Sequence, residues 1–176
     1  MKNCGLGATL NLSGQIYTEN GRLFTNTCSV SCYSGASGSI TKGVLSLSIG
    51  IPDRLESILH ATTWDYVYDD LTFTPDDVKA RWLRSWRVAD NSSHYSGLFL
   101  GRRKETSNLF KDITYLYVDK DVTVTGKGKT VSGIIIADLE LNLKTGWNAI
   151  YSKKTTTTYC ETVGDIASIK WIIWEK

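Results

Sequence analysis

The chain has 176 residues, of which 41% are hydrophobic and 22% are charged, and its formal net charge is +2. This length and composition favour one folded domain, residues 1–176, and exclude a disordered chain. The near-neutral charge excludes a general attraction to nucleic acid or to an anionic membrane, so we expect no nucleic-acid partner.

The amino-terminal residues 1–9 are predicted to form a flexible tether. They contain a basic residue, Lys2, but no apolar run of the length that an intact signal peptide needs. Two interpretations stay open: a cytoplasmic protein, or a mature exported protein whose leader has been removed. In the second, Cys4 followed by Gly5 stands where a bacterial lipoprotein carries its lipid. We favour export to the periplasm, the outer surface or the extracellular space, with membrane contact only through a lipid anchor at Cys4.

The four cysteines, Cys4, Cys28, Cys32 and Cys160, bear on the same choice. Four cysteines allow three complete pairings, and the sequence does not select one of them. No histidine or second close cysteine pair accompanies Cys28 and Cys32, so no metal site is expected. Because disulfides persist in exported proteins, we expect at least one disulfide, involving Cys28 or Cys32.

A period of two dominates the hydrophobic pattern along the chain, which is typical of β-strands. Polar and apolar residues alternate over residues 45–49, 122–125 and 139–143, as in strands with one exposed face. Residues 113–118 and 169–174 are apolar on both faces, as in covered strands. The pattern predicts an all-β fold of about ten strands, by preference an antiparallel β-sandwich. A small up-and-down, lipocalin-like barrel is the alternative.

One helix start is predicted, at Thr74. The capping residue there is followed by Pro75, which suits the first helical position, and by Asp76 and Asp77, which suit the positive end of a helix dipole. We expect one or two helical turns that end before Arg81.

The segment from residue 79 to residue 87 holds the strongest candidate site. Trp82 and Trp86 are four residues apart, so they share a face in a strand or in a helix, and in a strand Arg84 lies between them. If this row is exposed, it can stack on a sugar ring or on an aromatic side chain of a partner. If it is buried, the tryptophans belong to the core and the arginines to its wet edge. More basic residues follow at 102–104.

No catalytic signature accompanies this segment. His60 and His94 have no partner in the sequence, and a Gly-x-Ser-x-Gly elbow is absent. The Gly-Lys-Thr at residues 128–130 lacks the earlier glycine of a phosphate loop. The five aspartates between residues 65 and 77 lack the spacing of a calcium loop and are interpreted as charged surface. We therefore expect a non-enzymatic protein without a metal or a cofactor.

Several strand-and-turn motifs are distinctive: GSITKGVLSLSIGIP at residues 38–52, YLYVDKDVTVTGKGK at 115–129, LNLKTGWNAIYSK at 141–153 and IKWIIWEK at 169–176. In these motifs the chain resembles uncharacterised exported β-rich proteins of spirochaetes and similar bacteria. The resemblance implies export, often as a lipoprotein, and no assigned activity.

Two functions are carried forward. The first is an exported or surface-anchored monomer that binds a partner protein or a glycan through Trp82, Arg84 and Trp86. The second is a lipocalin-like carrier of a small apolar ligand, which requires an open cavity in place of a filled core.

Overall fold

The computed structural model describes residues 5–31, 37–62, 64–83, 86–89, 95–165 and 168–175. Strands make up 65% of the structure and helices 5%, so the predicted all-β class is confirmed. More strands are found than the ten or so expected. Two of them, β5 (Glu56–Ser57) and β12 (Thr130–Val131), are only two residues long and therefore leave no periodic pattern in the sequence.

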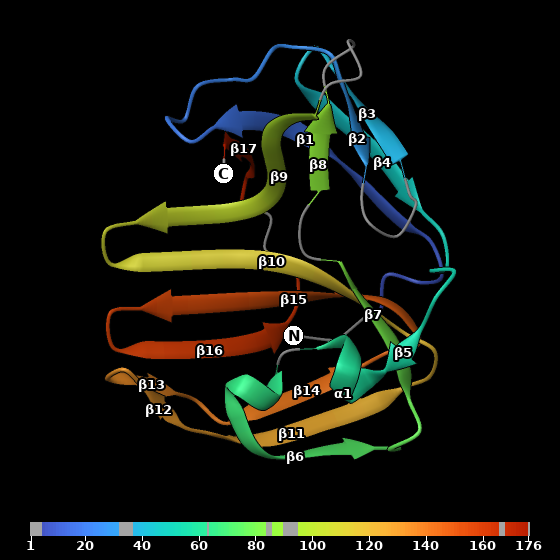
Figure 1. The fold of residues 1–176 in the computed structure, drawn as a ribbon, viewed down its shortest axis with the longest axis vertical. Helices are drawn as coiled ribbons and strands as arrows, with labels where there is room; N and C mark the ends of the chain where they lie inside the picture. Colours follow the sequence, from blue (N-terminus) through green and yellow to red (C-terminus); the bar gives the residue numbers. More distant parts are fainter. Residues whose placement is uncertain are drawn as a thin grey trace.

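The upper half of the molecule in Figure 1 is a closed seven-stranded barrel. Hydrogen-bonded neighbours follow one another in the order β9, β17, β1, β4, β3, β2, β8 and back to β9. All of these pairs are antiparallel except the pair of β1 with β17. The barrel strands are β1 (Leu10–Thr18), β2 (Cys28–Ser31), β3 (Ser37–Thr41), β4 (Val44–Ile49), β8 (Trp86–Ala89), β9 (Tyr95–Thr106) and β17 (Trp171–Glu175).

The barrel core follows from the alternation in its strands. In β4, Leu45, Leu47 and Ile49 are buried, whereas the residues between them are exposed. The predicted strand with one wet face is thus confirmed. Burying each such side chain contributes about 1.5–3 kcal/mol, so the period of two is the main local reason why this strand takes its place in the barrel.

The lower half of the molecule consists of two sheets with a common hydrophobic core between them. The first is the continuation of the barrel sheet beyond the β9–β10 pair. It contains β7 (Lys79–Leu83), β10 (Leu109–Val118), β15 (Gly146–Thr155) and β16 (Thr158–Val163), with β5, β12 and β13 (Ile134–Ile136) at its margins. The second sheet contains β14 (Leu139–Leu143), β11 (Val122–Gly128) and β6 (Tyr68–Thr74). Two short helical turns, α1 (Ile58–Ala61) and η1 (Trp64–Tyr66), each add one buried side chain to this core. We call this half the sandwich.

Strand β10 connects the two halves because both of its faces are buried. Tyr115 and Tyr117 belong to the barrel core, whereas Leu116 and Val118 belong to the sandwich core. The residues 113–118 are therefore covered on both sides, as their sequence predicted. Strand β15 continues the arrangement, with Trp147 in the barrel core.

Two sequence predictions need correction. The closed unit is a barrel, which fits the alternative prediction better than the preferred sandwich. The alternating pattern identifies strands, but it does not indicate that β8 returns to pair with β9 and closes the ring. The predicted helix after Thr74 is also wrong, since β6 continues to Thr74 and residues 75–78 form a bend. The cis peptide bond between Thr74 and Pro75 lies at this bend.

The expected disulfide is not found among the described residues. Cys28 is buried in the barrel core, and Cys160 is a free thiol on β16 in the sandwich half, so the two cannot pair. Cys4 and Cys32 lie outside the described residues.

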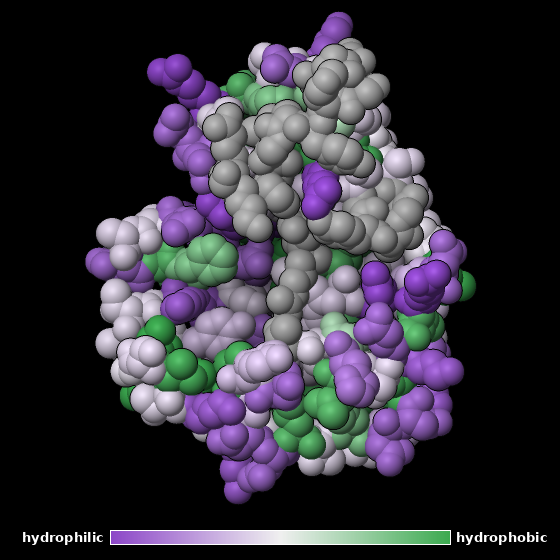
Figure 2. All heavy atoms as spheres, in the orientation of Figure 1, coloured by the Kyte–Doolittle hydropathy of each residue, from purple (hydrophilic) through white to green (hydrophobic). Residues whose placement is uncertain are grey.

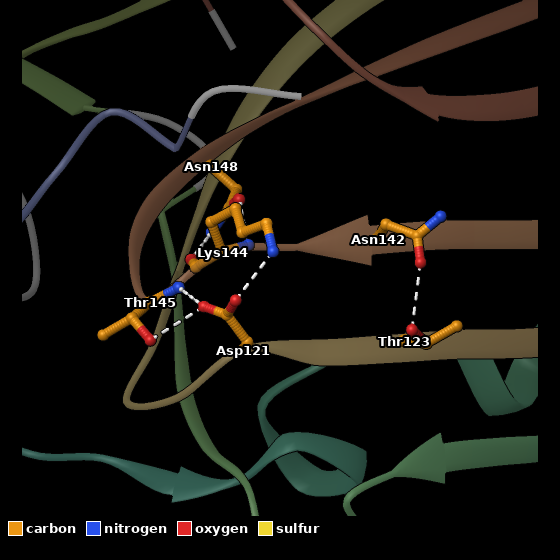
Figure 3. Close-up of polar contacts among 6 residues, drawn as sticks. All are labelled: Asp121, Thr123, Asn142, Lys144, Thr145 and Asn148. Carbon is orange, nitrogen blue, oxygen red and sulfur yellow. Dashed lines mark hydrogen bonds and ion pairs between the residues drawn. The ribbon is translucent and has the colours of Figure 1, made fainter. Parts of the chain in front are cut away.

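A polar clamp sets the turn from β14 into β15 (Figure 3). The Asp121 carboxylate accepts hydrogen bonds from the Lys144 ammonium at 2.7 Å and from the Thr145 backbone N–H at 2.8 Å. The Asn148 side chain holds the same turn by accepting from the Lys144 N–H at 2.9 Å and donating to the Lys144 carbonyl at 2.7 Å. Hydrogen bonds lower the pKa of Asp121 to about 2. The one from Lys144 has the largest effect, and those from Thr145 come next.

The outer surface is mixed in character. Figure 2 shows hydrophobic side chains as separate patches between hydrophilic ones, as expected where most large apolar side chains are interior. None of the helices among the described residues has the length and apolar character to cross a membrane.

Candidate ligand-binding surface

The structure places Trp82 and Trp86 in different cores. Trp82 lies on β7, is half-buried, and meets Trp64 edge-on with ring centroids 5.6 Å apart in the sandwich. Trp86 lies on β8, is 3% exposed, and packs in the barrel core with its ring centroid 5.0 Å from that of Trp171. The chain passes from the sandwich to the barrel between these two residues.

The prediction that Trp82 and Trp86 share one face is therefore wrong. Their spacing implies a common face only within one continuous strand, whereas β7 ends at Leu83 and β8 begins at Trp86. Arg84 lies outside the described residues. A ligand role for the row depended on an exposed common face, and the burial of Trp86 favours the core interpretation. We therefore look for a binding surface elsewhere.

A row of three lysines crosses neighbouring strands below the barrel. Lys104 on β9 lies directly opposite Lys111 on β10, and Lys111 lies directly opposite Lys153 on β15. Directly opposite residues in antiparallel strands point to the same side of the sheet, and neighbouring strands are about 4.8 Å apart. The three side chains therefore form one basic line, which we call the lysine row.

No ion pair neutralises the lysine row among the described residues. Other lysines of this chain are paired: Lys120 with Asp77, Lys129 with Asp69 and Lys144 with Asp121. Like charges directly opposite one another destabilise a sheet. The three ammonium groups of the lysine row therefore repel one another, and an anionic ligand would reduce this repulsion.

A pocket of about 450 Å³ adjoins the row, with Lys104 among its lining residues. Lys170 also lines it and lies with its Nζ 4.1 Å from the centroid of the Tyr17 ring. Ile172 adds an apolar side chain to the wall. Arg103 lines the pocket as well, but Glu19 neutralises its guanidinium at 2.8 Å. Besides Arg103 and its two glutamate partners, Glu19 and Glu105, the pocket combines an aromatic ring, an aliphatic side chain and two lysines that have no ion pair among the described residues.

A second pocket of about 570 Å³ shares Tyr17 and Lys170 with the first. Its lining includes Arg102, which is 8% exposed and forms an ion pair with Asp165. Arg102 also donates to the Tyr115 hydroxyl at 3.4 Å. Burial raises the pKa of Tyr115 to about 12 against the opposing effect of Arg102. The Tyr115 hydroxyl is therefore neutral and accepts the hydrogen bond from Arg102. In this second pocket, Asp165 already neutralises the charge of Arg102.

Sequence reasoning identified the basic run 102–104 but missed the lysine row. Lys111 and Lys153 are far from Lys104 in the sequence, and only the register of β9, β10 and β15 brings the three together. No group of three or more metal-ligating side chains occurs in the part of the chain that the structure describes. Comparison with protein-family models, with curated proteins and with solved structures finds no match.

Proposed function

We propose that this is a non-enzymatic binding protein that holds an acidic glycan on the lysine row and in the adjoining pocket. The observation that supports the proposal most is the register of Lys104, Lys111 and Lys153, which places three cations in line. None of the three forms an ion pair with a described residue. Carboxylate or sulfate groups of a saccharide chain would neutralise these charges in sequence.

The adjoining pocket favours a saccharide over a flat protein surface. Its volume of about 450 Å³ falls within the range of about 300–1,000 Å³ that is usual for small-ligand sites. Tyr17 and Ile172 offer apolar contact to a sugar ring, while Lys104 and Lys170 offer charge-assisted hydrogen bonds to its acidic groups.

The other expectations remain predictions. Export, a lipid anchor at Cys4 and a monomeric state accord with a glycan-binding role at a cell surface. The alternative, a carrier of a small apolar ligand, receives less support, because buried side chains from the barrel strands and from β10 and β15 pack together in the barrel core.

The test is titration calorimetry with polyglucuronate and with neutral dextran of matched length, at an ionic strength of about 0.15 M. We expect polyglucuronate alone to bind. The triple variant Lys104→Gln/Lys111→Gln/Lys153→Gln should bind about tenfold more weakly, since each exposed ion pair contributes about 0.2–1 kcal/mol.

The matched control replaces three lysines that already have aspartate partners, as Lys127→Gln/Lys129→Gln/Lys144→Gln. It removes the same charge and should bind like the wild type. Equal affinity for dextran and polyglucuronate, or equal loss in the two triple variants, would overturn the proposal.

A further inference from the structure

A second polar row crosses the same sheet on its other face. Asp112 on β10 lies opposite Ser152 on β15, and Ser152 lies opposite Glu161 on β16. Successive residues of a strand point to opposite faces, so this row faces the interior of the sandwich while the lysine row faces away from it. The Glu161 carboxylate is thereby held at the edge of the sandwich core.

Three neutral hydroxyl groups converge on this carboxylate. Tyr159 donates to Oε1 of Glu161 at 2.8 Å, and Ser152 donates to the same oxygen at 3.1 Å. Tyr68, from the opposite sheet, donates to Oε2 at 3.4 Å. Ser152 is 8% exposed and Tyr68 is 2% exposed, so the carboxylate lies among groups that water scarcely reaches.

In the part of the chain that the structure describes, the carboxylate has no positively charged partner. No lysine or arginine of the described residues forms an ion pair with Glu161. Burial raises the pKa of Glu161, although hydrogen bonds from the surrounding donors oppose the shift. A buried carboxylate without a counter-charge is unfavourable, and a cation placed beside it would relieve this cost.

Two buried polar atoms near the row lack a hydrogen bond of good geometry. Trp64 is 2% exposed, and its indole N–H faces the Glu161 carboxylate closely enough to lower the pKa of that group. Thr114 is 6% exposed and lies two residues after Asp112 on the same face of β10, with its Oγ1 unpartnered. The Trp64 N–H is thus already directed at Glu161. Buried polar groups are almost always satisfied, so the Thr114 hydroxyl is the one of these two that indicates room for a further partner.

Aromatic rings surround the same place. Tyr68 and Tyr159 contribute their hydroxyls to the carboxylate, and Trp64 meets Trp82 edge-on beside them. Rings of this kind attract cations through their π faces, and together with a carboxylate they are suited to ammonium groups. The site is not sealed, since Asp112, Tyr159 and Glu161 are only half-buried.

We propose that this site binds the protonated primary amino group of a small organic molecule. The ammonium group would pair with the Glu161 carboxylate and donate to Thr114 Oγ1, and the aromatic rings would contact the adjoining carbon chain. A metal ion fits less well, because no group of three or more metal-ligating side chains occurs among the described residues. The site is independent of the acidic-glycan surface, which lies on the other face of the sheet.

The probe is n-butylammonium, with n-butanol as its neutral counterpart. We expect n-butylammonium to shift the indole N–H resonances of Trp64 and Trp82 saturably in nitrogen–proton correlation spectra, and n-butanol to leave them in place. Glu161→Gln should weaken this binding at least tenfold. Glu140→Gln, which removes an exposed carboxylate from β14, should bind like the wild type.

A second variant guards against a folding defect in Glu161→Gln. Thr114→Val keeps the shape of the side chain and removes only a hydroxyl that has no partner, so it should fold and should bind n-butylammonium more weakly. Equal shifts with n-butanol, no shifts with either probe, or unchanged binding in folded Thr114→Val and Glu161→Gln would each overturn the proposal.

Discussion

A buried charge, Arg102, and a half-buried charge, Glu161, lie on opposite sides of β10, and their surroundings differ. On the barrel side, Arg102 donates to the Ile169 carbonyl and to the Tyr115 hydroxyl, and it forms an ion pair with Asp165. On the sandwich side, Glu161 accepts hydrogen bonds from neutral hydroxyl groups, and the neutral indole N–H of Trp64 also faces it. Arg102 has a counter-ion in Asp165, whereas no ion pair of Glu161 occurs among the described residues.

The difference separates a structural ion pair from a candidate ligand site. A buried charge with its partner in place stabilises a defined arrangement, and removing either partner is costly. A buried charge without a partner favours uptake of a proton or of a cation, and groups whose pKa is shifted by burial concentrate at functional sites. Substitutions on the two sides of β10 should therefore differ in their effect on stability.

Trp86→Ala should have the largest effect on stability. Trp86 is 3% exposed and stacks on Tyr115 beside Arg102 on the barrel side, so the substitution should cost about 3–5 kcal/mol. This loss corresponds to a decrease in Tm of about 10 °C for a chain of this size. Thermal melting checks it. Half-buried Trp82→Ala should lose distinctly less, and an equal loss in the two variants would contradict the assignment of Trp82 to the margin of the sandwich core.

Arg102→Met should have the next largest effect, a loss of about 3 kcal/mol in the free energy of unfolding. This is the lower end of the range for a broken buried ion pair, because Asp165 is partly exposed. The substitution leaves the Ile169 carbonyl and the Tyr115 hydroxyl without their donor. Arg103→Met is the control, since Arg103 pairs with exposed Glu19 and should lose about 1 kcal/mol or less. Denaturant unfolding measures both, and losses of similar size would refute the structural role of the Arg102 pair.

Glu161→Gln should change the pH dependence of stability. The pKa of Glu161 is raised in the folded protein, so the folded state holds a proton that the unfolded chain has released, and stability falls as pH rises from the unfolded pKa of about 4.5 through the folded pKa. The glutamine side chain does not titrate, so the variant lacks this pH-dependent contribution to stability. Its Tm relative to wild type should therefore increase between pH 4 and pH 7, and a constant difference over this range would show that the carboxyl group is not perturbed.

Asp121→Asn should change the pH dependence of stability by a smaller amount and in the opposite direction. The folded pKa of Asp121 is about 2, below the ordinary value of 3.8, so its contribution is fully present above the unfolded pKa and is lost as pH falls toward the folded pKa. Wild type should exceed the variant in Tm at pH 6, and the two should converge near pH 2. A difference that persists unchanged at pH 2 would assign the effect to the turn hydrogen bonds in place of the charge.

The sequence was a good guide wherever a local period decides the outcome. The alternation around Leu45 and Leu47 predicted a strand with one buried face, and the unbroken apolar run 113–118 predicted a strand buried on both. It failed at Trp82 and Trp86, because a shared face requires one continuous strand and the chain changes core between them. It also failed after Thr74, where a run of helix-start residues forms a bend.

By itself, the sequence therefore determined the all-β class and the side of each regular strand that is buried, since both depend on residues two positions apart. Only the tertiary structure decided which strands are neighbours. The lysine row and the Glu161 site each combine residues from β10, β15 and a third strand, and a change of register by one residue would turn either set to the other face. Pairing between distant strands is set by the closure of the whole barrel and sandwich, and no local pattern in the chain encodes it.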